Sequence, residues 1–430
     1  MTEQGKQKVH FIGIGGIGIS AIARMMLLEG AEVSGSDATL TLVTDELEKL
    51  GAKIFIEHNL ANIPEETTLV IYTIAISETN PELVEAKKRG LTVLSYPEAL
   101  GKISREKFTI AVSGTHGKTT TTAMLAKIFM DAAKEPTVIV GSFLKGEKSN
   151  FIAGSGPFIV EACEYRRSFL NLSPRILVIT NVDEDHLDYY KDLDDIEGAF
   201  RELAQRVPPD GFIVCNPNHP NLLPVLNGVS AKIVDYTKEG SIPPLVLPGE
   251  HNKENAQAAI SVARALGLPE ELIQTSLAAF QGTWRRFDYK GTTRTGAYIY
   301  DDYAHHPAEV RASILGFREK FPGKKLTIIF QPHLYSRTKE HLQAFAQSLS
   351  LADQVIVLPI YASRETDPGD IKSEDLARLL TEKGKVAEGF SRVALLLGLL
   401  SANDVVVTMG AGDVYKVGEE ILGAGPEVLT

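Results

Sequence analysis

Short β-branched apolar runs alternate with helical patterns along the whole chain. In the first hundred residues the runs are VHFIG, AEVSGSD, AKIFIEH, TLVIYTIAI and LTVLSYPEA, and a helical pattern such as Thr44 to Leu50 separates them. A parallel connection must cross from one end of the sheet to the other, so strands that alternate with helices indicate parallel α/β structure. The pattern predicts a parallel α/β domain here.

The same alternation returns twice. A second series opens at Phe108 with FTIAVSGTHGKTTTTAML, continues through TVIVGSF, PFIVEACEY, RILVITNVDEDH and GFIVCN, and ends in a helix expected from His251. A third series begins at Tyr298 and contains IYDDYAHHP, KLTIIFQPHLYSRT, DQVIVLPIYASRE and DVVVTMGAGD. Single cores stop growing at roughly 250 to 300 residues, so 430 residues require more than one. We predict domains at residues 1–103, 104–290 and 291–430.

Composition narrows the class of protein. Hydrophobic residues make up 44% of the chain and charged residues 23%, as in ordinary soluble proteins. The net charge of -11 argues against a nucleic-acid partner, because such proteins display basic surfaces. The two cysteines, Cys163 and Cys215, form neither a disulfide framework nor a zinc pattern. With a polar leader and no long apolar run, the sequence predicts a cytoplasmic protein without a membrane partner.

The first motif that carries chemistry is GIGGIG, at the end of the first predicted strand. Its glycines are Gly13, Gly15, Gly16 and Gly18. A helix is expected from about Ser20, and Asp37 follows the next strand at the distance of a ribose-binding acid. Glycines permit a tight turn, and the amino end of a helix offers free N–H groups to a diphosphate. A packing turn, a nicotinamide dinucleotide site and a uridine diphosphate sugar site all fit this motif.

The second motif, GTHGKTT, lies between the strand FTIAV and a helix. Its residues are Gly114, Thr115, His116, Gly117, Lys118, Thr119 and Thr120. It resembles the phosphate-loop pattern GxxxxGK[ST] but is shorter, because Val112 occupies the position of the first glycine of that pattern. Lys118 is expected to contact the β- and γ-phosphates of a nucleotide, and the Thr119 hydroxyl to contact Mg²⁺. A lysine between glycine and hydroxyl groups at such a junction has little reason to be there for packing.

Acidic residues and a histidine follow the next two apolar runs. Glu161 ends one run, and His186 lies in the acidic cluster after the other. The carboxyl ends of parallel strands meet at one edge, so both side chains are expected near the γ-phosphate, where oxygen ligands suit Mg²⁺. A carboxylate after a strand is more often a helix cap, so the assignment of Glu161 as a metal ligand depends on its place beside the loop.

Two further clusters suit a nucleotide. Asn252 and Asn255 lie three residues apart at the start of a helix, on one face, and suit an adenine edge, although ordinary capping explains them equally well. An arginine of the pair Arg285-Arg286 could meet phosphate oxygens when domains close, and Asp302 could meet a ribose, although a charge pair at a linker is usually solvated. In the third series each strand is followed at once by polar residues, namely His305, His306, His333, Arg337, Arg364, Glu365 and Asp413.

Together these motifs resemble the Mur ligases of peptidoglycan synthesis. GIGGIGIS, SGTHGKTTTTAML, EACEYRRSFL, TNVDEDHLDYY, GEHNKENAQAAI, TWRRF, DDYAHHPAEV, FQPHLYSRT, IYASRE and GAGDV occur in the order and approximate spacing of that family, over nearly the whole chain. GTHGKTTT with DDYAHHP is similar to its alanine-adding branch and to a close relative, the muropeptide-recycling ligases, and EACEYRR favours the alanine-adding branch. The resemblance implies an α/β fold with a Rossmann-like amino-terminal domain, a central parallel-sheet domain like those of P-loop ATPases, and a Rossmann-like carboxyl-terminal domain.

The resemblance also implies roles for individual residues. The UDP-sugar site takes the glycines of the first motif with Asp37 and His58. The muramoyl carboxylate and incoming alanine are surrounded by His116, Tyr165, His305, His333, Arg337 and Arg364. The adenine, phosphate and ribose partners are Asn252, Asn255, Arg286 and Asp302. Magnesium is held by Thr119, Glu161 and His186, and the catalytic residues are Lys118, His186, Arg286 and His305.

The implied activity is ATP- and Mg²⁺-dependent ligation of L-alanine to the lactyl carboxylate of UDP-N-acetylmuramate, by a monomer or homodimer. Within the family, a recycling ligase would add a preformed tripeptide instead. A nicotinamide oxidoreductase would use the first motif but leave GTHGKTTT unexplained. A regulatory module would bind nucleotide without turnover, so a product assay separates it from a ligase.

Overall fold

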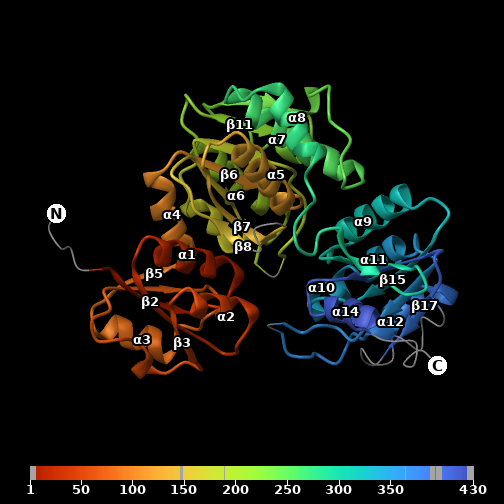
Figure 1. Ribbon diagram of the computed structural model, residues 1–430, viewed down its shortest axis with the longest axis horizontal. Helices are drawn as coiled ribbons and strands as arrows, with labels where there is room; N and C mark the ends of the chain where they lie inside the picture. Colours follow the sequence, from red (N-terminus) through yellow and green to blue (C-terminus); the bar gives the residue numbers. More distant parts are fainter. Residues whose placement is uncertain are drawn as a thin grey trace. The chain divides into compact units, whose positions relative to one another are not determined.

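Three sheets form the framework of the protein. The computed structural model describes residues 6–145, 149–187, 189–363, 365–387, 393 and 400–423. The chain divides into two compact units, Met1–Ile242 with Asn255–Leu277, and Pro243–Glu254 with Ala278–Thr430. The first unit holds two sheets and the second holds one (Figure 1). The predicted α/β class is confirmed, and the boundaries after residues 103 and 290 stay predictions.

The first sheet is parallel, with the strand order β3-β2-β1-β4-β5. Its strands are β1 (Lys8–Ile12), β2 (Glu32–Asp37), β3 (Lys53–Ile56), β4 (Leu69–Tyr72) and β5 (Thr92–Ser95). Its helices are α1 (Ile17–Leu28), α2 (Leu42–Lys49), η1 (Leu60–Asn62), α3 (Pro81–Lys88) and α4 (Tyr96–Glu106). The chain reverses its direction of growth between β1 and β4. In open α/β sheets a ligand binds at such a reversal, and the glycine motif follows β1 there.

The two faces of β1 bury different kinds of residue. Successive side chains of a strand point to opposite faces. Val9 and Phe11 belong to the large core that includes α1, whereas Ile12 packs with Leu83 of α3. His10 is also completely buried, and it shares the α3 face with Ile12. A polar group therefore lies inside an otherwise apolar layer.

The central sheet has the order β12-β11-β10-β6-β9-β7-β8. Its strands are β6 (Thr109–Ser113), β7 (Thr137–Leu144), β8 (Ser149–Ile152), β9 (Phe158–Glu161), β10 (Ile176–Ile179), β11 (Phe212–Cys215) and β12 (Lys232–Asp235). Its helices are α5 (Lys118–Asp131), η2 (Tyr165–Asn171), α6 (Leu193–Gln205), η3 (Pro220–Leu222), η4 (Tyr236–Lys238), α7 (Glu250–Ala265) and α8 (Glu270–Ala278). Because β6 lies in the middle, the loop after it is flanked by the ends of β9 and β10.

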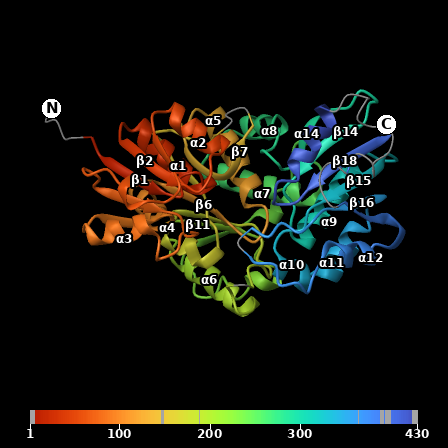
Figure 2. The ribbon, with the colours of Figure 1, turned by 90° about the horizontal axis from the view of Figure 1, so that it is seen from below.

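The third sheet has the order β13-β14-β18-β15-β16-β17. Its strands are β13 (Asp288–Thr292), β14 (Tyr298–Asp302), β15 (Lys325–Phe330), β16 (Gln354–Val357), β17 (Gly384–Val386) and β18 (Asp404–Met409). Its helices are α9 (Pro307–Lys320), α10 (Tyr335–Glu340), α11 (Leu342–Leu349), α12 (Ser373–Leu379), η5 (Thr381–Lys383) and α14 (Tyr415–Gly423). Figure 2 shows β18, β15 and β16 side by side.

The structure departs from the sequence pattern mainly at element ends and sheet edges. Helix α1 begins at Ile17 rather than near Ser20, and α2 begins earlier than Thr44 because Thr41 forms a capping box. The pattern did not predict the antiparallel pairing of β8 with β7 or of β13 with β14. Among the described residues, no helix combines the length and apolar composition of a membrane span.

Two glycines inside helices give opposite predictions for stability. A β-carbon at Gly198 in α6 meets no atom within 4 Å, whereas one at Gly101 in α4 would overlap the backbone carbonyl of Asn171. Gly198→Ala should raise the free energy of unfolding by about 0.5 to 1 kcal/mol, because alanine loses less backbone entropy in a helix. Gly101→Ala should lower it by about 1 to 3 kcal/mol, as overpacking does.

Thermal melts of both variants beside the wild type measure this difference. Equal shifts of the melting temperature in the two variants would contradict the packing of α4 against η2.

Candidate active site

The loop between β6 and α5 has the backbone of a phosphate loop. Gly114 and Gly117 adopt φ angles of 133° and 86°, which disfavour any residue with a β-carbon. A β-carbon at Gly114 would also overlap the Thr180 hydroxyl, and one at Gly117 would overlap the Asn255 side chain. The loop leads directly into the amino end of α5, whose free N–H groups favour an anion. The predicted phosphate loop therefore has a backbone suited to its role.

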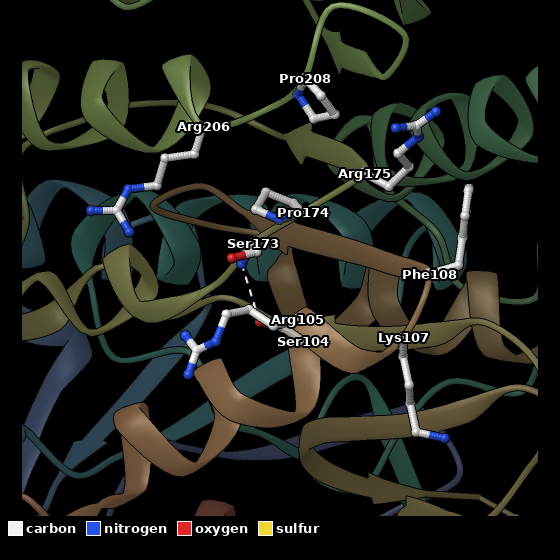
Figure 3. A pocket seen from close by; sticks show the side chains of 9 residues that line it. All are labelled: Ser104, Arg105, Lys107, Phe108, Ser173, Pro174, Arg175, Arg206 and Pro208. Atoms are coloured by element: carbon white, nitrogen blue, oxygen red, sulfur yellow. Dashed lines mark hydrogen bonds between the residues drawn. The ribbon is translucent and has the colours of Figure 1, made fainter.

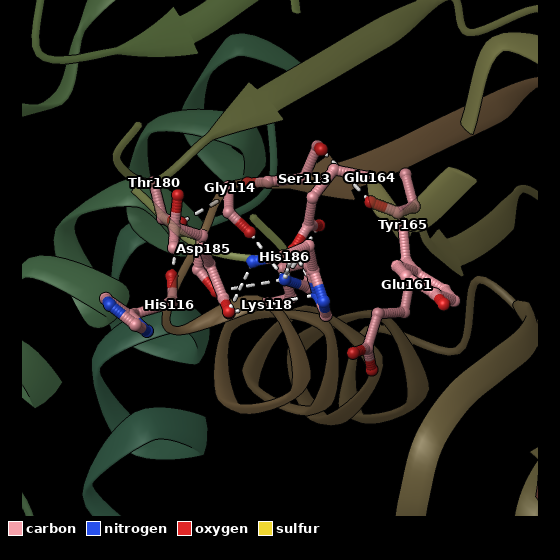
Figure 4. Close-up of polar contacts among 12 residues, drawn as sticks. Ser113, Gly114, His116, Lys118, Glu161, Glu164, Tyr165, Thr180, Asp185 and His186 are labelled. Atoms are coloured by element: carbon pink, nitrogen blue, oxygen red, sulfur yellow. Dashed lines mark hydrogen bonds and ion pairs between the residues drawn. The ribbon is translucent and has the colours of Figure 1, made fainter. Parts of the chain in front are cut away.

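The end of β10 fastens this loop. The amide of His116 donates to Asn181 Oδ1 at 2.8 Å, and Asn181 Nδ2 donates back to the His116 carbonyl at 3.1 Å. Thr180 also donates its hydroxyl to the His116 carbonyl (Figure 4). These bonds fix the backbone of the loop before any ligand is bound, as preorganised sites require.

Lys118 forms a buried ion pair with Glu164. Its Nζ lies 2.9 Å from the Glu164 carboxylate and donates to the carbonyls of Gly114 and Thr115 at 2.6 and 3.0 Å. Burial disfavours both charges, but the pair overcomes it, so the pKa of Glu164 lies below its usual value and the pKa of Lys118 above its own. Lys118 is therefore charged and held in the loop (Figure 4).

Thr119 and Glu161 come together as predicted for a metal site. The Thr119 hydroxyl lies 3.0 Å from Glu161 Oε1, and the other carboxylate oxygen accepts a bond from the amide of Gly141 at 2.7 Å. A hydroxyl beside a carboxylate at the mouth of a phosphate loop is an oxygen donor set of the kind that suits Mg²⁺. These residues would fit a magnesium ion.

A second group of possible ligands surrounds His186. Ligand atoms of Glu164, Asp185 and His186 all lie within 4.8 Å of one another, and the Tyr165 ring lies 4.8 Å from the His186 ring between centroids, with the planes tilted by 44°. Nδ1 of His186 is buried and has no hydrogen-bond partner among the described residues. The acids beside His186 are thus Glu164 and Asp185, and the sequence analysis did not select either of them. Glu161 and Glu164 both lie in EACEY, and position in a motif does not reveal which one meets the histidine.

The predicted adenine residues lie at the start of α7. Asn252 donates to the carbonyl of Pro248 at 2.7 Å, and Oδ1 of Asn255 accepts from the Thr121 hydroxyl at 3.2 Å. Both asparagines are buried. Asn255 therefore contacts the helix that follows the phosphate loop, while its role toward adenine stays a prediction.

The glycine motif of the first sheet is fastened to β2. The amides of Gly13 and Ile14 donate to the Ser36 carbonyl at 2.8 and 3.0 Å, and the amide of Gly15 donates to Asp37 Oδ2 at 2.8 Å. One oxygen of Asp37 is thus used to shape the loop. The predicted roles of Asp37 and of the glycines toward a UDP-sugar stay predictions.

In the second unit, Asp302 is fixed by backbone groups. Its carboxylate accepts bonds from the amides of Phe287 and Ala304, each at 2.9 Å. Burial raises its pKa to about 6, although the charge of Arg286 and these bonds act in the opposite direction. Arg286 lies over the Tyr303 ring at 5.3 Å. The predicted phosphate and ribose partners are therefore neighbours.

Three other predicted residues gather at the ends of β14 and β15. The rings of His305 and His333 lie 5.9 Å apart, and Arg337 Nη1 lies 3.3 Å from His333 Nδ1. His333 also stacks on Tyr361, with 15° between the ring planes. Arg364, which the sequence analysis placed here, lies outside the described residues. An imidazole nitrogen, a guanidinium and the surrounding rings suit a small polar substrate.

Arg285 was not selected as a site residue from the sequence. It is buried, lies 2.7 Å from Asp301, and donates to the carbonyls of Gly412 and Gly410 at 2.7 and 2.6 Å. It joins β13 and β14 to the loop after β18. Its neighbour Arg286 was selected instead, because two adjacent arginines in a linker look alike in a sequence.

A cavity of about 570 Å³ lies elsewhere in the first unit and contains none of the predicted site residues (Figure 3). Its lining residues are Ser104, Arg105, Lys107, Phe108, Ser173, Pro174, Arg175, Arg206 and Pro208. Lys107 and Arg175 precede β6 and β10, so the cavity is at the opposite edge from the phosphate loop. Arg105 and Arg206 end α4 and α6, where a cation stabilises the helix dipole. Their charge therefore has a structural reason.

The raised pKa of Asp302 makes a prediction for stability. Its folded pKa of about 6 exceeds the ordinary value of 3.8. Protonation of Asp302 therefore contributes to the free energy of unfolding below about pH 4, and this contribution is lost as the pH rises through about 6. The stability of the wild type relative to Asp302→Asn should therefore fall between pH 4 and pH 7, by at most about 3 kcal/mol.

Thermal melts at several pH values measure this difference. Asp353→Asn is the matched control, because a bond from Arg318 lowers the pKa of Asp353 and its contribution is lost at lower pH. Parallel profiles of the wild type and Asp302→Asn would contradict the shift.

Comparison with known proteins agrees with this architecture. Residues 8–108 match the model of the Mur ligase family, catalytic domain. Residues 112–242 match the Mur ligase middle domain, and residues 285–412 match the Mur ligase, glutamate ligase domain. The three matches follow the order of the three sheets.

Individual relatives are similar over their full length. The UDP-N-acetylmuramate--L-alanine ligase of Clostridium kluyveri is 40% identical over 446 residues, which cover 96% of this chain and 97% of the relative. That of Agathobacter rectalis is 41% identical over 450 residues, with 96% and 97% covered. The crystal structure of the UDP-N-acetylmuramate-alanine ligase MurC from Thermotoga maritima is 31% identical, has a TM-score of 0.83 and covers 97% of this chain and 98% of its own. The chain belongs to the Mur ligase family.

Proposed function

We propose that the protein joins L-alanine to the lactyl carboxylate of UDP-N-acetylmuramate, with cleavage of ATP to ADP and phosphate, in peptidoglycan precursor synthesis. The observation that carries the proposal is the phosphate loop with Lys118 paired to Glu164 and Thr119 beside Glu161. The names and full-length similarity of the relatives support the choice of alanine as the amino acid.

The first step transfers the γ-phosphoryl group. An oxygen of the lactyl carboxylate attacks the γ-phosphorus, the bond to the β-phosphate oxygen breaks, and ADP leaves with an acyl phosphate as the other product. Such transfer needs positioning and neutralised charge. Lys118, released from the loop carbonyls, contacts the β- and γ-phosphates, and the loop amides bind the chain of phosphates. Magnesium, held by Thr119 and Glu161, would neutralise charge on the phosphate oxygens.

The second step forms the amide bond. The neutral amine of alanine attacks the acyl carbon, the nitrogen of the tetrahedral intermediate loses a proton to solvent, and the intermediate collapses as inorganic phosphate leaves with one oxygen of the original carboxylate. Stabilising the negative charge on the intermediate requires cations or N–H donors. Arg286, His305, His333 and Arg337 are the proposed donors, and His116 and Tyr165 are proposed beside the carboxylate. The proposal places the reaction in the cytoplasm, with a monomer or homodimer.

Phosphate release tests this function. The protein is assayed with ATP, Mg²⁺ and UDP-N-acetylmuramate, together with L-alanine, other single amino acids or L-Ala-γ-D-Glu-meso-diaminopimelate, and the product mass is read. Release that requires L-alanine and gives the alanyl adduct is expected. A preference for the tripeptide would establish the recycling ligase instead, and no release with any acceptor would leave a binding module.

Loss of the loop lysine should slow turnover strongly. Lys118→Ala should lower kcat by roughly 10² to 10³, because a preorganised charge at the transferring group is lost. The variant also leaves Glu164 as a buried charge without its partner, so Lys118→Ala/Glu164→Gln separates chemistry from stability.

Lys127→Ala is the matched control. Lys127 lies on the same helix and pairs with Asp131 at the surface, so turnover should not change. Wild-type turnover in a folded Lys118 variant would contradict the assignment.

A further inference from the structure

The carboxylate of Glu82 is completely buried beneath the first sheet and accepts bonds from several segments. Oε1 accepts from the amide of Asn59 at 3.0 Å and from Asn62 Nδ2 at 2.6 Å. Oε2 accepts from the Ser36 hydroxyl at 2.6 Å and lies 3.2 Å from His10 Nε2. Glu82 thereby connects α3 with β1, β2 and the segment after β3.

Packing alone does not require an acid at this position. Leu83 and Ala86 of α3 are fully buried against Ile12 and Val70, which already holds the helix on the sheet. A buried carboxylate loses its hydration, so an apolar residue would serve a purely structural purpose at least as well. Burial opposes ionisation of Glu82, but the bonds from its neighbours outweigh burial and lower its pKa. The acid is therefore ionised.

An ionised carboxylate sets the direction of the adjoining hydrogen bonds. It has no proton to donate, so the hydroxyl proton of Ser36 must point to Glu82. The Ser36 oxygen then accepts from His58 Nδ1, which lies 2.9 Å away. A neutral His58 carries its proton on Nδ1, and its Nε2 is an acceptor. Within the described part of the chain no hydrogen bond reaches that Nε2, and the side chain is 22% exposed.

Glu82, Ser36 and His58 thus form a hydrogen-bond relay. The relay ends where the first sheet is expected to bind its ligand. Ser36 precedes Asp37 at the carboxyl end of β2, and its carbonyl holds the amides of Gly13 and Ile14. His58 follows β3 at the same edge. The same serine thus supports the glycine loop through its backbone and orients His58 through its side chain.

We propose that Glu82 is a positioning residue for the UDP-sugar site, which acts through Ser36 to hold His58 as a hydrogen-bond acceptor. His58 then selects a ligand N–H or O–H, such as the imide of uracil or a sugar hydroxyl, and not the diphosphate, which has no proton to donate at neutral pH. The inference deepens the proposed function and rests on it for the identity of the ligand.

Nuclear magnetic resonance tests the relay without turnover. In protein labelled with ¹⁵N-histidine, at a pH of about 8 where an unperturbed imidazole is neutral, two-bond proton–nitrogen correlations distinguish the tautomers. The His58 signals are assigned with His58→Gln. The Nδ1–H form is expected in the wild type, and mainly the Nε2–H form in Glu82→Gln, since a loss of affinity of about 10-fold requires the competent form to become the minor one. An Nε2–H form in the wild type, or no change in Glu82→Gln, would overturn the proposal.

Kinetics test the consequence for the substrate. Glu82→Gln should raise KM for UDP-N-acetylmuramate about 10-fold, as expected for a lost hydrogen bond, with kcat and KM for ATP within about 2-fold of the wild type. Ser36→Ala breaks the same relay but leaves the other hydrogen bonds of Glu82, so it should raise KM by the same factor. It keeps the test valid if Glu82→Gln does not fold.

Glu46→Gln is the matched control, since Glu46 pairs with Arg24 in the same part of the chain and does not touch the relay. If the Glu82 and Ser36 variants instead lose kcat, or behave as Glu46→Gln does, the proposal is wrong.

Titration of wild-type protein with UDP by calorimetry distinguishes failure of the proposed function from failure of the proposed relay. Binding of UDP without turnover would refute the proposed function, whereas the tautomer of His58 is measured independently of both.

Discussion

The buried ion pair between Lys118 and Glu164 is the interaction on which the catalytic geometry depends. It holds the phosphate-loop lysine at the end of β9, and Glu164 in turn lies beside His186 from the segment after β10. Removing one partner of such a pair leaves an uncompensated buried charge, which lowers the free energy of unfolding by about 3 to 5 kcal/mol. Bound phosphates and magnesium would give both charges new partners. The ion pair therefore keeps both side chains charged and in place before the nucleotide binds.

The sequence predicted the elements well, since their apolar periodicity and glycine motifs are local. The sequence also predicted that Thr119 and Glu161 lie close together, because parallel strands end at one edge of the sheet. It could not decide which acid of EACEY meets His186, since Glu161 and Glu164 are three residues apart and the turn after β9 sets their directions. Nor could it identify Arg285, whose partners Gly410 and Gly412 are distant in the chain.

Polar residues inside apolar layers were the hardest to predict and are the most informative. Glu82 lies in a helix whose other buried residues are apolar, and His10 lies within a strand that looks entirely hydrophobic. Both are explained when their hydrogen bonds are followed to Ser36 and His58 at the ligand edge. A buried charge is costly and needs several segments to satisfy it, so its hydrogen bonds are worth following when a site is sought.

The central claim is that the site transfers the γ-phosphoryl group of ATP to a carboxylate. It is tested most directly with UDP-N-acetylmuramate carrying ¹⁸O in its lactyl carboxylate, ATP, Mg²⁺ and L-alanine. The account predicts that inorganic phosphate acquires one ¹⁸O atom per molecule and that ADP is unlabelled. Label in AMP, or unlabelled phosphate formed together with the alanyl product, would contradict an acyl phosphate and with it the proposed roles of Lys118 and Glu161.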